Sequence, residues 1–139
     1  MALDASPPVT GDRAHARLPL ALLALLTLIC LATLWAPPAG RKSWVLEVTP
    51  GLLYVGALAV LYRRFPMSNL VYGGLFVHVL ILIYGGCYTY ALTPLGNWMR
   101  DHWHLARNPY DRVGHFALGF FPAITIREVL LRKTPLERG

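Results

Sequence analysis

The sequence predicts an all-α protein, a polytopic bundle of about four helices that span a membrane. Three observations favour this fold class: charged residues are scarce, four stretches are long and apolar, and the cations lie between those stretches. Only 14% of the 139 residues are charged and the mean hydropathy is +0.46, whereas a soluble domain is about 25% charged. Because so little charge leaves an apolar surface, we expect the chain to lie in a bilayer.

The first expected span covers residues 18–36 and contains no charge. It is long enough to cross a hydrocarbon core of roughly 30 Å. A cleaved signal peptide is the alternative, but its apolar core usually has about 7 to 15 residues before a small-residue cleavage site. Here Trp35 and Pro37 follow instead, so we favour an anchor. Residues 1–17 have no hydrophobic period and are expected to form a disordered tail.

Three further spans are expected at residues 44–62, 70–84 and 112–131. The pair Gly85 and Gly86 should break the third helix, because glycine weakens a helix interior. Pro122 should kink the fourth, which membrane helices tolerate. The membrane domain is therefore expected to cover residues 18–133, followed by a short tail at 134–139.

The segment between the last two spans is an expected interfacial loop over residues 87–111. It carries a dense set of aromatic side chains among charges and histidines: Tyr88, Tyr90, Trp98, Trp103 and Tyr110. Tryptophan and tyrosine at such density are typical of the headgroup level of a membrane. We therefore expect a short helix over residues 94–105 that lies in the interface.

The net charge of +6 indicates membrane flanks rather than nucleic-acid binding, because the 13 Lys and Arg residues are spread between apolar runs. With both termini in the cytoplasm, eight of these cations lie on the inner side and five on the outer side. The excess of inner cations predicts that both termini are cytoplasmic. The 87–111 loop would then face the periplasm.

Four ionisable residues are candidates for chemistry. Asp111 and His115 are four residues apart and share a helix face, where a carboxylate can orient an imidazole for proton transfer or metal binding. Alternatively, Asp111 simply caps a helix. His78 lies mid-span and is either functional or a hydrogen-bonded packing residue. Glu47 either pairs with the basic residues just before it or lies at the rim of a polar cavity.

Three arginines of the loop are candidate ligands for lipid headgroups or other phosphates, because the guanidinium fork suits phosphate oxygens: Arg100, Arg107 and Arg112. No metal is assigned, and the candidate metal ligands are His78, Cys87 and His115. The sequence contains no phosphate-binding loop, zinc-protease motif or serine-triad order. It indicates no particular cofactor.

Three runs carry a resemblance to a known family: YRRFPMSNLVY, GGCYTYALTPLGNWMRD and RNPYDRVGHFALGFFPAITIREVLL. From Trp44 to Leu131 the chain is similar to the YjdF-like family of bacterial inner-membrane proteins, a domain of unknown function. The resemblance implies a multi-pass location in the bacterial inner membrane. The family pattern reads GGHYTY, so Cys87 stands where the family has histidine. Family members also continue further, so we expect a C-terminal truncation at Gly139.

The run YDRVGHF also resembles, more distantly, the DKxxHF signature of VanZ-like membrane proteins, which would share Asp111 and His115. We therefore expect a polar pocket formed by His78, Asp111 and His115, near Glu47. If the protein is an enzyme, acid–base or metal-assisted chemistry on a lipid-linked substrate at the periplasmic face fits best. The alternative is a non-enzymatic scaffold or envelope-homeostasis factor. The lipid bilayer is the expected partner, and no oligomeric state is indicated.

Overall fold

The computed structural model describes residues 11–134, with side chains from Arg17 onward. Four long helices and two short ones make up this part of the chain: α1 (Gly11–Trp35), α2 (Arg41–Leu61), α3 (Asn69–Tyr88), η1 (Tyr90–Leu92), α4 (Pro94–His102) and α5 (Tyr110–Lys133). All four long helices are apolar and long enough to cross a membrane. Since the described residues form no strand, the predicted all-α fold class is confirmed.

The helix bounds differ from the expected spans at two places. α1 begins at Gly11, so residues 11–17 of the expected tail are helical, because Ala14 and Ala16 favour a helix that the apolar span already nucleates. The rest of that tail, like residues 135–139, lies outside the described residues. The expected break at Gly85 and Gly86 is wrong, since α3 continues to Tyr88. Both glycines lie where neighbouring elements pack closely against α3, and this packing offsets their weak helix propensity.

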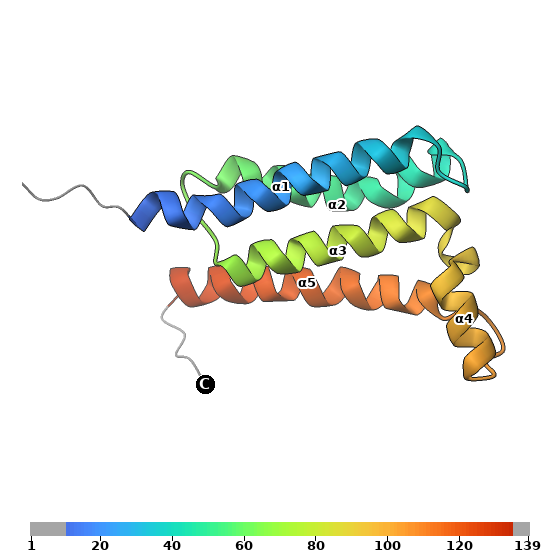
Figure 1. Ribbon diagram of the computed structural model, residues 1–139. Helices are drawn as coiled ribbons and strands as arrows, with labels where there is room; N and C mark the ends of the chain where they lie inside the picture. Colours follow the sequence, from blue (N-terminus) through green and yellow to red (C-terminus); the bar gives the residue numbers. More distant parts are fainter. Residues whose placement is uncertain (1–10, 135–139) are drawn as a thin grey trace, which may run out of the picture.

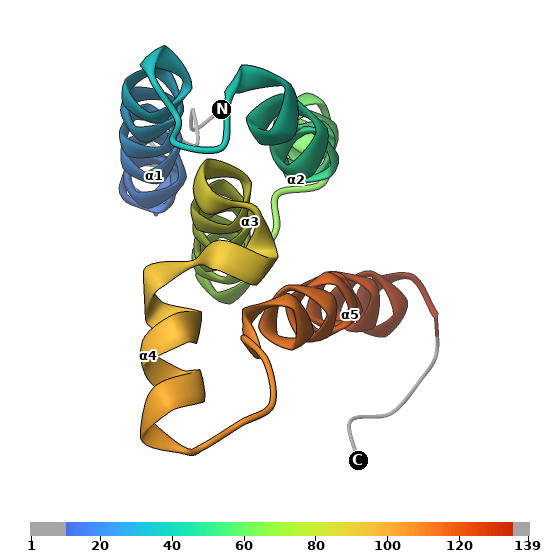
Figure 2. The same cartoon turned by 90° about the vertical axis from the view of Figure 1, so that its right-hand side faces the viewer.

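α3 is the central helix of the bundle, and α1, α2 and α5 all pack against it (Figure 2). Half of its apolar window is buried, compared with 6% of that of α1. A helix surrounded in this way must be apolar on every side, which fits the sequence of α3. The core contains residues of three helices: Leu26, Val48, Val71, Leu75, Val79 and Ile83.

η1 and α4 lie at one end of the bundle, which we call the α4 end, and α4 runs crosswise to the long helices (Figure 1). α4 packs mainly on η1 and exposes Leu95 and Trp98. Asn108 holds the loop between α4 and α5 in place. Its side-chain amide donates hydrogen bonds to the Thr93 carbonyl and to the side chain of Asn97, both at 3.0 Å. The crosswise direction is the one expected for the predicted interfacial helix.

The opposite end of the bundle holds the α2–α3 loop, the start of α1 and the end of α5 (Figure 1). There Glu128 of α5 accepts hydrogen bonds from the Ser68 amide at 2.7 Å and from the Ser68 hydroxyl at 2.5 Å. Arg132 bridges the same carboxylate, at 2.5 Å, to the carbonyl of Pro66, at 2.6 Å. We call these residues the Glu128 clamp. It joins the loop to the last turns of α5.

Candidate functional site

His78 lies deep in the bundle and is only 2% exposed. Its ring stacks on Phe121 of α5 at a centroid distance of 5.5 Å and meets the edge of the Tyr54 ring of α2 at 6.1 Å. The Tyr54 hydroxyl pairs with Thr125 rather than with the imidazole. Among the residues that the structure describes, neither ring nitrogen of His78 has a hydrogen-bond partner. His78 therefore packs as an aromatic ring between α2 and α5.

This environment makes a testable prediction for His78. A buried polar group without a partner costs about 1–3 kcal/mol, and phenylalanine keeps the flat ring that stacks on Phe121. We therefore expect His78→Phe to leave the thermal unfolding temperature in detergent unchanged or higher. A clear drop in that temperature would show that the imidazole makes a hydrogen bond that stabilises the bundle.

Asp111 and His115 lie together near the start of α5, with side chains that are 59% and 75% exposed. Nδ1 of His115 lies 2.9 Å from the backbone carbonyl of Asp111 and 3.5 Å from its carboxylate. A carbonyl oxygen only accepts hydrogen bonds, so Nδ1 carries the proton. No described residue forms a hydrogen bond with Nε2 of this exposed ring.

The structure does not bring His78 to this pair. The buried positions of α5 recur along one face, at Gly114, Ala117 and Thr125, whereas Asp111 and His115 lie on an exposed face. The expected pocket of three residues is therefore not formed by the described part of the chain. The arrangement follows from packing, because the face of α5 that approaches α3 also carries Tyr110, which bonds the Ile81 carbonyl, and Phe121, which stacks on His78.

The three candidate metal ligands are also separate. His78 is enclosed by aromatic rings, Cys87 is buried and lines a cavity beside Thr33 and Pro37, and His115 is exposed. No group of three His, Cys, Asp or Glu side chains within the described residues is placed to hold a metal ion.

Tyr90, which the sequence did not single out, occupies the centre of the α4 end. Thr89, with φ of 53°, turns the chain sharply out of α3. The turn places the Tyr90 ring between Gly85 of α3 and Gly114 of α5, where an added Cβ would lie 2.5 Å and 2.4 Å from ring atoms. Glycine is required at both positions for this close approach. Tyr90 thus acts as a wedge between the two helices.

Two carboxylates influence the Tyr90 hydroxyl. Burial raises the pKa of Tyr90 well above its ordinary value, and the negative charges of Glu47 and Asp111, with Tyr110, raise it further. The phenol therefore stays protonated and can donate a hydrogen bond. Glu47 of α2 lies against Gly86 of α3, on the side of α2 that faces the bundle.

The expected pairing of Glu47 with nearby cations is not recorded in the structure. Arg41 instead donates a hydrogen bond to the carbonyl of Trp35 at 3.0 Å, and no ion pair joins Lys42 to Glu47 among the described residues. Glu47 is half-buried and has no ion pair with a described residue, while its negative charge acts on Tyr90 of the α4 end.

The candidate phosphate ligands lie on the segment that carries α4 and the start of α5. Arg100 pairs with Asp101 at 2.8 Å, and this guanidinium holds the pKa of the Asp101 carboxyl below its ordinary value. Arg107 and Arg112 are exposed, and the described residues offer neither of them an ion pair. Arg107 and Arg112 thus remain available to an anionic ligand.

Glu128 is the second important residue that sequence reasoning missed. It is an acid within a span, where an ionisable side chain calls for a partner, and Arg132 lies four residues later on the same helix face. These two signals are present in the sequence, but the partner in the α2–α3 loop is 60 residues away. The sequence has no comparable pattern for Tyr90, because the two glycines on which its ring packs belong to different helices.

Four helices of membrane-spanning length that pack around a central one define the class: this is a polytopic membrane protein. Residues 18–139 match the family described as "Predicted membrane protein (DUF2238)", and the chain belongs to this family. Over 92 residues it is 44% identical to the inner membrane protein YjdF of Escherichia coli (strain K12). The predicted YjdF-like family is thereby confirmed. No solved structure matches the chain.

The match with YjdF covers 66% of this chain and 44% of that protein. The chain therefore spans less than half the length of the relative. Together with the four apolar helices, the relationship makes this chain a multi-pass protein of the inner membrane. Neither description names a reaction, a ligand or a partner.

Proposed function

We propose that this membrane protein carries out acid–base chemistry on a lipid-linked substrate at the periplasmic interface, with a site at the α4 end of the bundle. The observation that supports this proposal best is the orientation of His115. Its Nδ1 lies 2.9 Å from the backbone carbonyl of Asp111 and no described residue bonds Nε2, so in the neutral ring Nε2 is free to accept a proton. A neutral imidazole held in one tautomer by a neighbouring residue is suited to act as a general base.

In this proposal His115 takes a proton from a hydroxyl group, either of water or of the substrate, and then returns it to the leaving group. The carboxylate of Asp111 stabilises the imidazolium that forms in between, because an opposite charge within a few ångströms favours the charged ring. Asp111 and His115 lie in the first turns of α5, next to the segment that carries Trp98 and Trp103. These aromatic side chains favour a position at the headgroup level, where a lipid-linked substrate exposes its polar part.

The arginines of the same segment would supply the substrate contacts. Arg107 and Arg112 are exposed, and the guanidinium group of each can donate two parallel hydrogen bonds to phosphate oxygens. Arg112 directly follows Asp111 on α5, so a phosphate bound there would lie in the same region as the proposed base. A lipid phosphate or diphosphate is therefore the substrate class that this region fits.

The test is a His115→Ala variant in vesicles that contain an envelope lipid extract, with conversion of lipid-linked species followed by mass spectrometry. Removal of a general base typically lowers a rate by about 100-fold to 10,000-fold, so we expect conversion to fall at least 100-fold. His104→Ala is the matched control, because His104 is also an exposed histidine of the α4 end and has no proposed role. Both variants should insert into the membrane as the unchanged protein does.

Conversion that persists in His115→Ala would contradict the role of His115 as the base. Absence of conversion by the unchanged protein would contradict the enzymatic proposal and support a non-enzymatic scaffold. One observation favours that second candidate: His78, the other histidine weighed for function, packs as an aromatic ring without hydrogen bonds to the described residues. For a scaffold, His115→Asn should be tolerated, since asparagine also bonds to backbone groups. Loss of conversion in His115→Asn, with insertion intact, supports the enzyme instead.

A further inference from the structure

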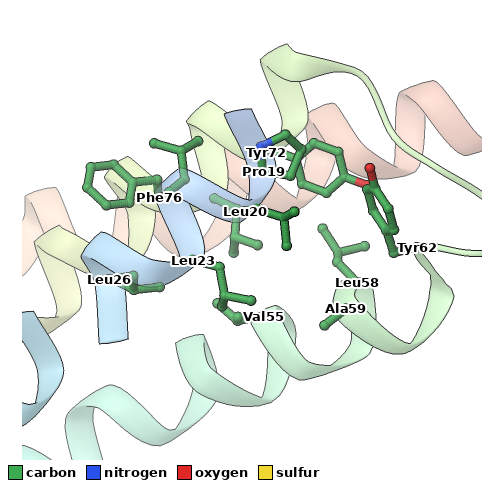
Figure 3. A pocket seen from close by; sticks show the side chains of 12 residues that line it. Pro19, Leu20, Leu23, Leu26, Val55, Leu58, Ala59, Tyr62, Tyr72 and Phe76 are labelled. Carbon is green, nitrogen blue, oxygen red and sulfur yellow. The ribbon is translucent and has the colours of Figure 1, made fainter. Parts of the chain in front are cut away.

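The end of the bundle opposite α4 contains a cavity that the proposed chemistry does not use. It has a volume of about 170 Å³ and lies between α1, α2 and α3. Leu20 and Leu23 of α1 face Val55 and Leu58 of α2 across it (Figure 3). α1 packs against α3 far more than against α2, and this weak contact leaves the space open.

The lining of the cavity is apolar except at one end. There the rings of Tyr62 and Tyr72 lie 6.0 Å apart (Figure 3). The Tyr72 hydroxyl already accepts a hydrogen bond from the Met67 amide at 3.0 Å, whereas no described residue bonds the Tyr62 hydroxyl. The cavity thus offers an apolar interior and a polar group at the end nearest the α2–α3 loop.

Three arginines lie close in the sequence to residues that line the cavity. Arg63 and Arg64 follow Tyr62 directly, and Arg17 comes two residues before Pro19, which lines the cavity. All three arginines are exposed. The acid of this region, Glu128, is engaged by Ser68 and Arg132 in the Glu128 clamp. The positive charge beside the cavity is therefore left for a ligand outside the protein.

We propose that this cavity binds one anionic phospholipid of the surrounding leaflet, with an acyl chain between α1 and α2 and the phosphate on Arg17 and Arg63. The apolar lining favours a hydrocarbon chain, and arginine favours a phosphate. The size of the cavity excludes a protein partner, because a helix with its side chains is about 10–12 Å wide. This site is independent of the proposed reaction, which lies at the other end of the bundle.

The experiment uses the full chain in detergent, with native mass spectrometry to count bound phosphatidylglycerol or phosphatidylcholine of identical acyl chains. We expect one retained phosphatidylglycerol and weaker retention of phosphatidylcholine. An arginine near a membrane surface contributes about 1 kcal/mol to anionic lipid binding, so Arg17→Gln and Arg63→Gln should each weaken phosphatidylglycerol retention about fivefold. Arg127→Gln is the matched control and should change nothing, because Arg127 is an exposed arginine of α5, which does not line the cavity.

A second pair of variants tests the cavity itself. Ala59 lines it and Ala57, two residues earlier on the same helix, does not, so Ala59→Trp should displace the lipid while Ala57→Trp retains it. Equal retention of the two lipids, or loss of retention in Ala59→Trp without any effect of the arginine variants, would overturn the anionic assignment. Unchanged retention in a folded Ala59→Trp would overturn the site. Thermal unfolding of each variant establishes that it is folded.

Discussion

Glu128→Ala lowers the free energy of unfolding by about 3 kcal/mol, the largest effect that we expect for any single substitution in this chain. The Glu128 carboxylate is only 15% exposed and accepts two hydrogen bonds from Ser68 as well as the ion pair with Arg132. A hydrogen bond to a charged group contributes about 1.5–3 kcal/mol, and removing the acid also leaves the partly buried polar groups of the loop without a partner. We expect the loss to appear as a lower midpoint in denaturant unfolding of the detergent-purified protein.

Arg127→Ala is the matched control for this variant, because Arg127 is the preceding residue of α5, is exposed and has no ion pair with the described residues. A double-mutant cycle with Ser68→Ala should show that the two changes are not additive, since both remove the same contact. If Glu128→Ala and Arg127→Ala have equal midpoints, the clamp does not stabilise the bundle.

Gly114→Ala destabilises the bundle by about 1–3 kcal/mol, the range for adding a methyl group to a tightly packed site. The new Cβ would lie 2.4 Å from the Tyr90 ring, a distance at which the ring or α5 must move. Because Tyr90 also contacts Gly85 of α3 on its other side, the ring has little room to retreat. We expect the thermal unfolding temperature to fall by several degrees.

Gly119→Ala on the same helix is the control, since nothing lies within 4 Å of the Cβ that it adds. It should be neutral or slightly stabilising, because alanine favours a helix more than glycine does. Tyr90→Ala in the background of Gly114→Ala should recover part of the loss by removing the ring that clashes. Equal unfolding temperatures for Gly114→Ala and Gly119→Ala would show that Tyr90 is not wedged between α3 and α5.

Local patterns in the sequence account for the features that were predicted correctly. Four spans, the short helix of the loop and the contact between Asp111 and His115 all depend on neighbours along the chain. The i, i+4 spacing of that pair places both residues on one helix face whatever the rest of the molecule does. The glycine pair in α3 misled the prediction, because the helix-weakening effect of Gly85 and Gly86 is a local one, whereas the packing that overrides it comes from Tyr90 and α2.

The grouping of the polar residues depended on contacts between distant segments. His78, Asp111 and His115 were expected in one pocket, yet α5 turns the face of its buried residues toward α3 and leaves Asp111 and His115 exposed. Glu128 meets Ser68 across 60 residues, and the Tyr90 ring needs a glycine from each of two helices. Hydropathy reports how much of a helix is apolar, but it does not report which neighbour each face will meet.

The sequence by itself thus determined that this is a multi-pass membrane protein of the YjdF-like family, because span length, apolar composition and the family runs are properties of the linear chain. Only the tertiary structure decided that α3 is the central helix, that His78 packs apart from the Asp111–His115 pair, and that Glu128 holds one end of the bundle together and Tyr90 the other. The physical reason is that close packing selects helix faces by the shape of side chains from several helices at once.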